Sequence, residues 1–340
     1  LVECKKCNAR FRLDEIEKSH SERSEESPAN AGTDIRQRSF ADAQDDTLKC
    51  SKGGEHEFTE PKEFNTMFKV GETYLRPETA QGMFTDFKQI MEVSRKKNPF
   101  GIAQIGKSFR NEINTKDFLF RVREFEIAEI EYFVKPGEDE KMFDEWLKAW
   151  EDFILSLGIK KENIKHYEHP KESLAHYSKR TVDIQYKFPF GKKELAGVAN
   201  RTDFDLKSHE EASGKDLKYY DEETREKYWP YVIEPTVGIE RLMFAVICDA
   251  FEETKPRTET TEAATEKETI LHFNPKLAPI KVAVLPLLKK LSEDARKIYD
   301  DLKTCWSAME FDESGSIGRR YRRQDEIGTP FCVTIDFDTL

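Results

Sequence analysis

Two neighbouring segments with the alternation of β-strands, residues 101–112 and 118–129, constrain the fold of this 340-residue chain more than any other feature. Side chains two positions apart in a strand share a face, so Gln104, Arg110 and Glu112 lie together on the first strand. On the second strand, the shared face holds Arg121, Arg123, Phe125, Ile127 and Glu129. A short polar loop joins the two segments, and the pair therefore predicts a hairpin within an antiparallel sheet.

The arginines of this hairpin indicate what it binds. Guanidinium groups match phosphate oxygens in geometry and do not titrate near neutral pH. An aromatic ring such as Phe125 can stack on a base, which contributes roughly 1–3 kcal/mol in nucleic-acid systems. The hairpin therefore favours a nucleotide-binding surface, and the alternative is a solvated face with cross-strand ion pairs.

A second motif, residues 234–241, also favours nucleotide binding. Apolar residues follow its start at helical spacing: Ile239, Leu242, Met243, Val246, Ile247 and Ala250. We expect a strand that ends at Pro235, a turn at Gly238, and a helix with Arg241 in its first turn. The start of a helix is a favourable place for phosphate. The alternative is an exposed arginine on an amphipathic helix.

Composition and apolar spacing predict how the rest of the chain is organised. Only seven of the 30 residues in 19–48 are apolar, too few to offset the entropy of ordering, so we expect a disordered surface insertion there. The patterns elsewhere predict helix over 137–180, strand and loop over 181–206, a polar connection over 254–270, a strand over 280–285 and a helix over 289–303. A domain boundary near residue 275 follows.

The six cysteines indicate a metal site rather than a disulfide framework. Cys4 and Cys7 supply half of a tetrahedral zinc site, and Cys50 with His56 supplies the other half. The alternative is a set of free thiols on a loop. The remaining cysteines are isolated, which favours a reducing, cytoplasmic compartment: Cys248, Cys305 and Cys332.

Charge and hydropathy exclude some classes of protein. Acidic residues outnumber basic ones by 66 to 55, and the resulting net charge of -11 excludes a wholly basic nucleic-acid coat. No apolar run reaches the roughly 18 residues of a membrane span, and we expect no membrane association. A basic cluster at Gly318–Arg323 is still compatible with nucleic acid, because binding follows the local field.

Together these motifs resemble class II aminoacyl-tRNA synthetases, and among them glycyl-tRNA synthetases of the homodimeric type. Residues 109–112 and 120–125 resemble the second signature motif of the class, and residues 234–241 resemble the third. Family-like segments also occur at residues 74–82, 194–201 and 318–323. The resemblance covers residues 1–18 and 49–340, and five motifs in the same order make it specific.

The resemblance implies an α+β fold. An antiparallel sheet flanked by helices is expected in a catalytic domain at residues 1–275, followed by an α/β anticodon-binding domain at residues 276–340. The first motif of the class, which builds much of the dimer interface, is not found in the sequence, and the second domain ends early. We therefore expect a fragment of a homodimeric protein that is cut at both ends.

The resemblance also implies the activity of a glycine–tRNA ligase. Glycine and ATP give glycyl-adenylate, and the glycine is then transferred to the 3′ end of tRNA-Gly. Arginines and Mg²⁺ carry such a reaction by positioning and charge neutralisation, so no protein nucleophile is expected. The alternatives are a class II synthetase of another specificity, such as threonyl, prolyl or seryl, and a catalytically inactive tRNA-binding relative.

The implied ATP site has two catalytic residues. Arg110 is expected on the α-phosphate of ATP and Arg241 on the γ-phosphate, while Glu194 is expected to hold Mg²⁺. The expected ATP-binding set is Arg110, Asn111, Glu112, Phe120, Arg121, Arg123, Phe125, Glu194, Leu195, Gly238 and Arg241.

The implied glycine site is acidic. Glu78, Glu129 and Glu234 are expected around the ammonium group of glycine, Arg201 near its α-carbon, and Thr236 where the family usually has Ser. The alternative for each glutamate is a surface carboxylate. One methylene contributes only about 1–3 kcal/mol to binding, so we expect alanine to be rejected by steric exclusion.

The basic cluster near the end is expected to contact tRNA through Arg319, Arg320, Arg322 and Arg323, and the alternative is a solvated basic turn. The charge reversals Arg319→Glu and Arg322→Glu should weaken tRNA binding and flatten its salt dependence, because fewer counterions are released. Affinity measured across a salt series checks this. Unchanged affinity and slope would indicate the solvated turn.

Overall fold

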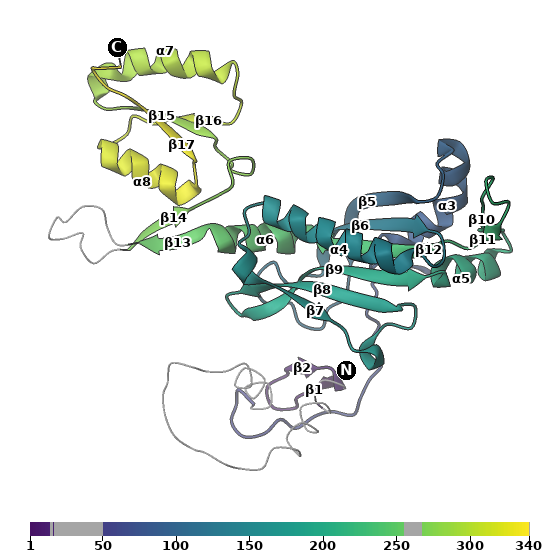
Figure 1. Ribbon diagram of the computed structural model, residues 1–340. Helices are drawn as coiled ribbons and strands as arrows, with labels where there is room; N and C mark the ends of the chain where they lie inside the picture. Colours follow the sequence, from purple (N-terminus) through teal and green to yellow (C-terminus); the bar gives the residue numbers. More distant parts are fainter. Residues whose placement is uncertain (14–15, 17–49, 255–266, 340) are drawn as a thin grey trace. The chain divides into compact units, whose positions relative to one another are not determined.

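The computed structural model describes residues 1–13, 16, 50–254 and 267–339 (Figure 1). The expected insertion at 19–48 and most of the expected connection at 254–270 lie outside the described residues. The chain forms two units: Leu1–Thr79 with Ile105–Ile127, and Ala80–Gln104 with Ala128–Leu340. Among the helices that the structure describes, none has the length and apolar character needed to cross a membrane.

A six-stranded sheet organises the fold. Its strand order is β5-β6-β12-β9-β8-β7, and β12 with β9, β9 with β8, and β8 with β7 pair antiparallel. The bounds are β5 Phe100–Phe109, β6 Glu124–Val134, β7 Ile164–Glu168, β8 Arg180–Phe188, β9 Gly191–Thr202 and β12 Tyr231–Gly238. Strands β5 and β6 run from one unit into the other, and the remaining strands of the sheet belong to the second unit.

Helix α4 (Asp139–Ser156) covers one face of this sheet. Its Phe143 packs with Val134, Val182, Val198 and Ile233 from four strands. Because side chains alternate along a strand, the neighbours of these residues point to the other face. Glu129, Glu131, Glu234 and Thr236 are thereby directed away from α4.

Phenylalanines fill the opposite face at one end of the sheet. Phe84 and Phe87 of α3 (Ala80–Ser94) pack with Phe100 and Phe133. Neighbouring ring centroids in this group lie 4.5–6.4 Å apart. The elements near this cluster are α5 (Phe204–Ser213), β10 (Tyr219–Tyr220) and β11 (Lys227–Tyr228).

Three local expectations were wrong. The helix expected over 137–180 ends at Ser156, because Gly158 adopts φ +99° and breaks it. Short 3-10 turns at Lys161–Asn163 and Lys171–Ser173 then flank β7. Pro235 does not end its strand: it lies inside β12, opposite Val198.

The arginines of the expected hairpin lie on a loop rather than on the strands. Strand β5 ends at Phe109 and β6 begins at Glu124. The intervening backbone folds on itself, because the amide of Arg110 donates to the carbonyl of Arg123 (3.0 Å) and Lys116 forms a bridge with Arg121. We call residues 110–123 the arginine loop.

The last part of the chain forms a smaller α/β layer. Three parallel strands in the order β16-β15-β17 pack with α7 and α8. Val284, Ala295, Tyr299, Met309 and Ile335 form their core. The bounds are β13 Phe251–Thr254, β14 Glu268–Leu271, β15 Val282–Pro286, α7 Ser292–Lys303, β16 Met309–Phe311, α8 Ile317–Ile327 and β17 Phe331–Ile335, while α6 (Ile239–Ala250) follows β12. The strand and helix expected at 280–303 correspond to β15 and α7.

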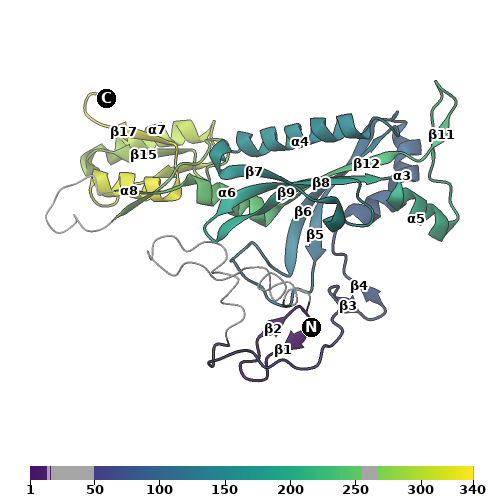
Figure 2. The same cartoon turned by 60° about the horizontal axis from the view of Figure 1, so that its bottom comes forward.

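Among the described residues of the first unit, the strands that lie wholly within it are short (Figure 2). Strand β1 (Val2–Glu3) pairs with β2 (Arg10–Phe11), and β3 (Lys69–Val70) pairs with β4 (Thr73–Tyr74). Residues 57–62 run beside residues 1–5: the amide of Lys5 donates to the carbonyl of Glu57 at 2.7 Å. Backbone hydrogen bonds, rather than a large apolar core, therefore hold this unit.

Candidate active site

An acidic pocket of about 270 Å³ lies in the second unit, on the face of the sheet away from α4. Three strands and the segment before β8 line it. The lining residues are His169, Ser173, Leu174, Ala175, Tyr177, Thr181, Asp183, Glu194, Gly197, Val198, Ala199, Glu234 and Thr236. Its polar wall therefore carries three carboxylates and one imidazole.

A buried arginine fixes one of these carboxylates. Arg201 is 2% exposed and donates from Nη1 to Glu234 at 2.7 Å. It also binds both oxygens of Asp205, at 2.8 and 2.9 Å, and its guanidinium lies 4.1 Å from the ring centroid of Tyr177. Burial by itself lowers the pKa of Arg201, but Asp205 and Glu234 raise it, so the group stays charged. Arg201 supports the pocket from behind rather than lining it.

Thr236 presents an unused hydroxyl beside Glu234. Both residues belong to β12, two positions apart, and both line the pocket. The Thr236 Oγ1 atom is buried and has no hydrogen-bond partner among the described residues. A buried hydroxyl without a partner costs stability, so a polar group of a ligand is expected to complete it.

Two further glutamates are buried on the same face of β6. Glu129 is 4% exposed and Glu131 is fully buried, with both carboxylate oxygens unpaired within the described structure. Burial raises the pKa of Glu131 well above its ordinary value, and the charge of Glu234 adds to this effect while Arg201 opposes it. Glu131 is therefore a neutral acid next to the charged group of Arg201, Asp205 and Glu234.

The expected phosphate and magnesium residues of the second unit lie together. Arg241, in the first turn of α6, pairs with Glu194 on β9 at 3.3 Å. Asp183 lines the same pocket, and its Oδ2 lies 2.9 Å from Nε2 of His169. Burial and the charge of Glu194 raise the pKa of Asp183. Two carboxylates and one guanidinium thus meet at one wall.

The arginine loop of the first unit carries the remaining arginines that were expected to bind ATP: Arg110, Arg121 and Arg123. The guanidinium of Arg110 lies 5.3 Å from the ring centroid of Phe125, and its Nε donates to the carbonyl of Pro77. Arg123 donates to the carbonyl of Glu112 at 3.0 Å, and Arg121 lies 3.8 Å from the Glu112 carboxylate. The loop therefore presents three arginines, and the ring of Phe125 follows it directly, on β6.

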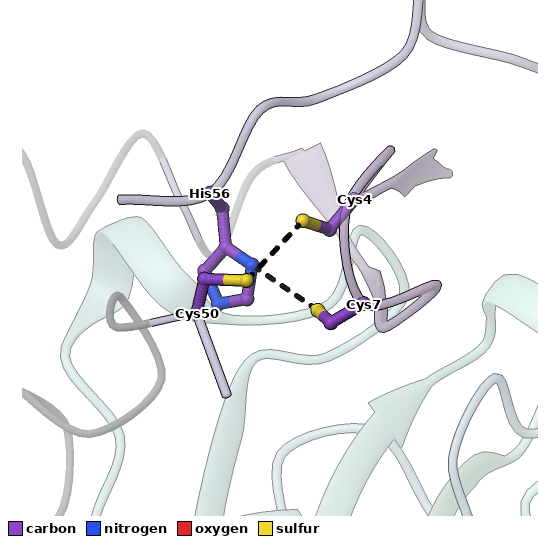
Figure 3. A group of neighbouring side chains, drawn as sticks. All are labelled: Cys4, Cys7, Cys50 and His56. Carbon is purple, nitrogen blue, oxygen red and sulfur yellow. Dashed lines mark hydrogen bonds between the residues drawn. The ribbon is translucent and has the colours of Figure 1, made fainter. Parts of the chain in front are cut away.

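Four ligand atoms meet near the start of the chain (Figure 3). The side-chain donors of Cys4, Cys7, Cys50 and His56 all lie within 4.8 Å of one another. The Cys4 and Cys50 sulfurs are 3.9 Å apart, and the Cys7 sulfur is 3.6 Å from Nδ1 of His56. Burial raises the pKa of the Cys4 thiol, but His56 and three backbone amides lower it to about 5.

Helix α8 changes one expectation for tRNA contact. Arg320 is 3% exposed and donates to the carbonyls of Pro286, Glu313 and Gly315, so it is an internal tie and does not face RNA. Arg323 binds Asp312, and Arg322 pairs with Glu326 at 3.3 Å. Arg319 is exposed.

Comparisons with known proteins identify the family. A family model of the class II tRNA synthetase core domain (G, H, P, S and T) matches residues 64–250, and an anticodon binding domain model matches residues 281–340. Glycine–tRNA ligases of Caldanaerobacter subterraneus, Streptomyces coelicolor and Clostridium acetobutylicum are 51%, 50% and 50% identical to the chain, over all of its length and 74% of theirs.

The chain belongs to the glycine–tRNA ligase family.

Membership of the glycine–tRNA ligase family decides between specificities that the core model alone leaves open. That model is shared by five amino acid specificities, whereas the relatives named above act on glycine. The threonyl, prolyl and seryl alternatives are thus not supported. The expected fold, an antiparallel sheet with helices followed by an anticodon-binding domain, is confirmed.

The structure brings together some expected residues of this glycine–tRNA ligase relative and separates others. Glu234 and Thr236 line one pocket with Glu194, whereas Glu129 lies buried on β6. Leu195 is 1% exposed and Phe120 is 8% exposed, so both side chains pack inside, and their expected place in the ATP site stays a prediction. Gly238 caps α6 in an extended conformation, and Asn111 and Glu78 lie in the first unit.

Sequence reasoning missed four residues of this site: His169, Tyr177, Asp183 and Asp205. Asp183 had a usable signal, because it alternates with the buried Val182 and Ile184 and so points away from the core. Asp205 follows Arg201 by four positions, a spacing typical of an ion pair. His169 and Tyr177 have no local signal, since only the fold brings their segment to the sheet.

The neutral state of Glu131 predicts a pH dependence of stability. Because the folded protein holds this proton more tightly than the unfolded chain, wild-type stability falls as pH rises above the ordinary glutamate pKa of 4.5. Glu131→Gln removes this dependence. The variant should gain stability relative to wild type as the pH rises above about 5, by up to about 1.4 kcal/mol per pH unit. Urea unfolding across this range measures it.

Glu126→Gln provides the matched control, because Glu126 lies on the same strand but is exposed. It should leave the pH profile of stability unchanged. A constant difference between Glu131→Gln and wild type at every pH would show that Glu131 is ionised in the folded protein.

Proposed function

We infer that this chain activates glycine with ATP and transfers the glycyl group to tRNA. Its family membership supports the reaction. The acidic pocket is the single observation that supports where glycine binds. The pocket combines a fixed carboxylate, Glu234, with a free hydroxyl, Thr236, on one strand. The ammonium group of glycine needs a carboxylate such as Glu234, and a polar atom of the bound ligand would satisfy the hydroxyl of Thr236.

We assign the ammonium group of glycine to Glu234, and we propose Glu129 and Glu78, the other two acidic residues that the family resemblance implies, as its further carboxylates. Arg201 acts as a positioning residue, because it holds the Glu234 carboxylate in one orientation. The pocket volume of about 270 Å³ exceeds that of glycine. Rejection of alanine therefore depends on a local wall beside the α-carbon rather than on total volume, and we propose that the methyl group of Thr236, which lines the pocket, contributes to this wall.

We assign the phosphates of ATP to Arg110 and Arg241. In the first step a glycine carboxylate oxygen attacks the α-phosphorus and pyrophosphate leaves; the guanidinium groups neutralise the charge that develops. Phe125 offers a ring for the adenine. When bound, Mg²⁺ supplies positive charge to the phosphate oxygens, and the carboxylates of Glu194 and Asp183 at the pocket wall fit such an ion.

We also propose a zinc ion in the group of Cys4, Cys7, Cys50 and His56 (Figure 3). A tetrahedral zinc with bonds of about 2.3 Å to sulfur and 2.0–2.1 Å to nitrogen places two sulfurs about 3.8 Å apart, and sulfur about 3.6 Å from nitrogen. The separations of 3.9 Å and 3.6 Å match these edges. All six cysteines are free, so no disulfide competes.

Partners and location follow from the same family. We propose that Arg319, Arg322 and Arg323 of α8, the arginines with accessible side chains there, contact tRNA-Gly, and that the protein forms a homodimer. The six free cysteines support a reducing, cytoplasmic location.

Exchange of pyrophosphate into ATP tests the first step directly. Protein containing residues 1–340 should exchange with glycine and much more slowly with alanine, serine, threonine or proline. Exchange with none of them would favour the inactive tRNA-binding alternative, and exchange with another amino acid would overturn the assigned specificity.

Glu234→Gln tests the assignment of the ammonium group. Loss of a charge-assisted hydrogen bond, worth about 1.5–3 kcal/mol, should raise KM for glycine about 10- to 100-fold and leave KM for ATP unchanged. Asp205→Asn is the matched control, because it also weakens the Arg201 bridge but does not line the pocket. Equal losses in both variants would indicate a structural role for Glu234.

Metal analysis of freshly purified, reduced protein tests the zinc assignment. We expect one zinc per chain, and none after Cys7→Ser, whereas Cys305→Ser, which changes an exposed thiol outside the group, should retain it. Wild-type protein without zinc would show that these side chains are free thiols.

A further inference from the structure

We propose that the zinc group positions the arginine loop for ATP, so that metal occupancy sets the affinity for the nucleotide. The inference rests on the zinc site proposed above and gives it a role in substrate binding. The residues that carry it, 1–11, 50–66 and 110–123, all belong to the first unit.

The metal group joins two segments that are distant in sequence. Cys4 and Cys7 lie in the turn between β1 and β2, which is closed by hydrogen bonds between Cys4 and Ala9 and between Asn8 and Cys4. Cys50 starts a second turn, closed by Gly53 and Gly54. His56 then leads into residues 57–62, which pair with residues 1–5. One ion would therefore hold both turns and the paired segments 1–5 and 57–62 that adjoin them.

Each of these two segments accepts a hydrogen bond from the arginine loop. The side-chain amide of Asn114 donates to the carbonyl of Arg10 at 2.8 Å, three residues after Cys7. On the other segment, the backbone amide of Asn111 donates to the carbonyl of Thr66 at 2.8 Å, and its side chain donates to that of Asn65 at 2.9 Å. The loop is thus tied to both sides of the metal group.

The hydrogen bonds of Asn111 and Asn114 help to position the arginines assigned to ATP. Asn111 directly follows Arg110, whose amide bonds to Arg123. Arg123 in turn donates to Glu112, which lies 3.8 Å from Arg121. A displacement at Asn111 therefore reaches Arg110 along the chain, Arg123 through its hydrogen bonds to Arg110 and Glu112, and Arg121 through the ion pair with Glu112. A displacement at Asn114 reaches Arg121 through the backbone bridge between Lys116 and Arg121.

The first unit has little else to fix this loop. Its buried apolar side chains among the described residues are Val2, Cys4, Cys50, Phe120 and Ile127, and two of the five are metal ligands. A unit with so small an apolar core commonly depends on a metal for its order. Without the ion, the backbone hydrogen bonds between residues 1–5 and 57–62 are left to hold the two segments together, the metal turns lose their shared ligand set, and ATP must order more of the loop as it binds.

The test compares wild type and Asn114→Ala, each with zinc bound and after removal of zinc by a chelator. Hydrogen–deuterium exchange of residues 110–123 and the Kd for ATP are measured in all four samples. Removal of zinc from wild type should speed exchange in the loop and weaken ATP binding about 5- to 100-fold, the range expected for loss of two hydrogen bonds. Asn114→Ala should keep its zinc and show part of both effects.

The decisive result is the effect of zinc removal on Asn114→Ala, compared with its effect on wild type. If the metal acts through the Arg10 carbonyl, zinc removal should change Asn114→Ala less than it changes wild type, because one connection is already broken. Thr115→Ala, an exposed neighbour of Asn114, is the matched control and should behave as wild type.

Three outcomes would overturn the inference: no zinc in the purified protein, zinc without any change in loop exchange or ATP affinity on its removal, or additive effects of Asn114→Ala and zinc removal. The last two leave the zinc site intact. Glycine-dependent pyrophosphate exchange, measured on the same zinc-loaded wild type, reports on the ligase activity separately. Where the zinc-free protein unfolds, zinc-loaded Asn114→Ala still tests the connection to Arg10: loop exchange and ATP affinity equal to those of wild type would overturn the inference.

Discussion

Arg201 lies between Asp205 and Glu234, with almost no access to water, and the acidic pocket depends on this contact. Removing a charge from water costs several kcal/mol, and such a group is tolerated only when its hydrogen bonds are satisfied. The buried charge of Arg201 therefore requires both carboxylates, and each carboxylate requires Arg201. As a result, Glu234 has a fixed orientation in the free protein, which reduces the entropy lost when a cation binds. The neutral acid Glu131 fits this arrangement, since a further negative charge beside Glu234 would be unfavourable.

The two sets of assigned substrate residues are held by different means. Pocket residues stand on the strands of a large sheet whose other face is packed against α4. The arginine loop instead depends on backbone and amide hydrogen bonds within a unit that has few buried apolar side chains. Electrostatic catalysis requires charged groups that do not reorganise during the reaction. The loop therefore needs an external support more than the pocket does.

Regular periodicity was enough to predict part of the fold. The strand and helix around Glu234 and Arg241, and those of the last domain, were found because their apolar spacing persists over many residues. Tertiary contacts decide the rest. Arg320 carries the same charge as Arg319, yet packing turns it toward three carbonyl groups. Pro235, which normally ends a strand, is accepted inside β12, and no local pattern announces this.

The Cys and His group also fixes where the long stretch between Cys7 and Cys50 leaves and re-enters the fold. In the proposed zinc site both ends of that stretch would be ligands of one centre, so their separation would not depend on what lies between them. The entropy of closing a loop grows only slowly with its length, by about 0.6 kcal/mol for each doubling. The residues between Phe11 and Cys50 can thus be lengthened, shortened or replaced at small energetic cost, provided that β2 and the four ligands stay.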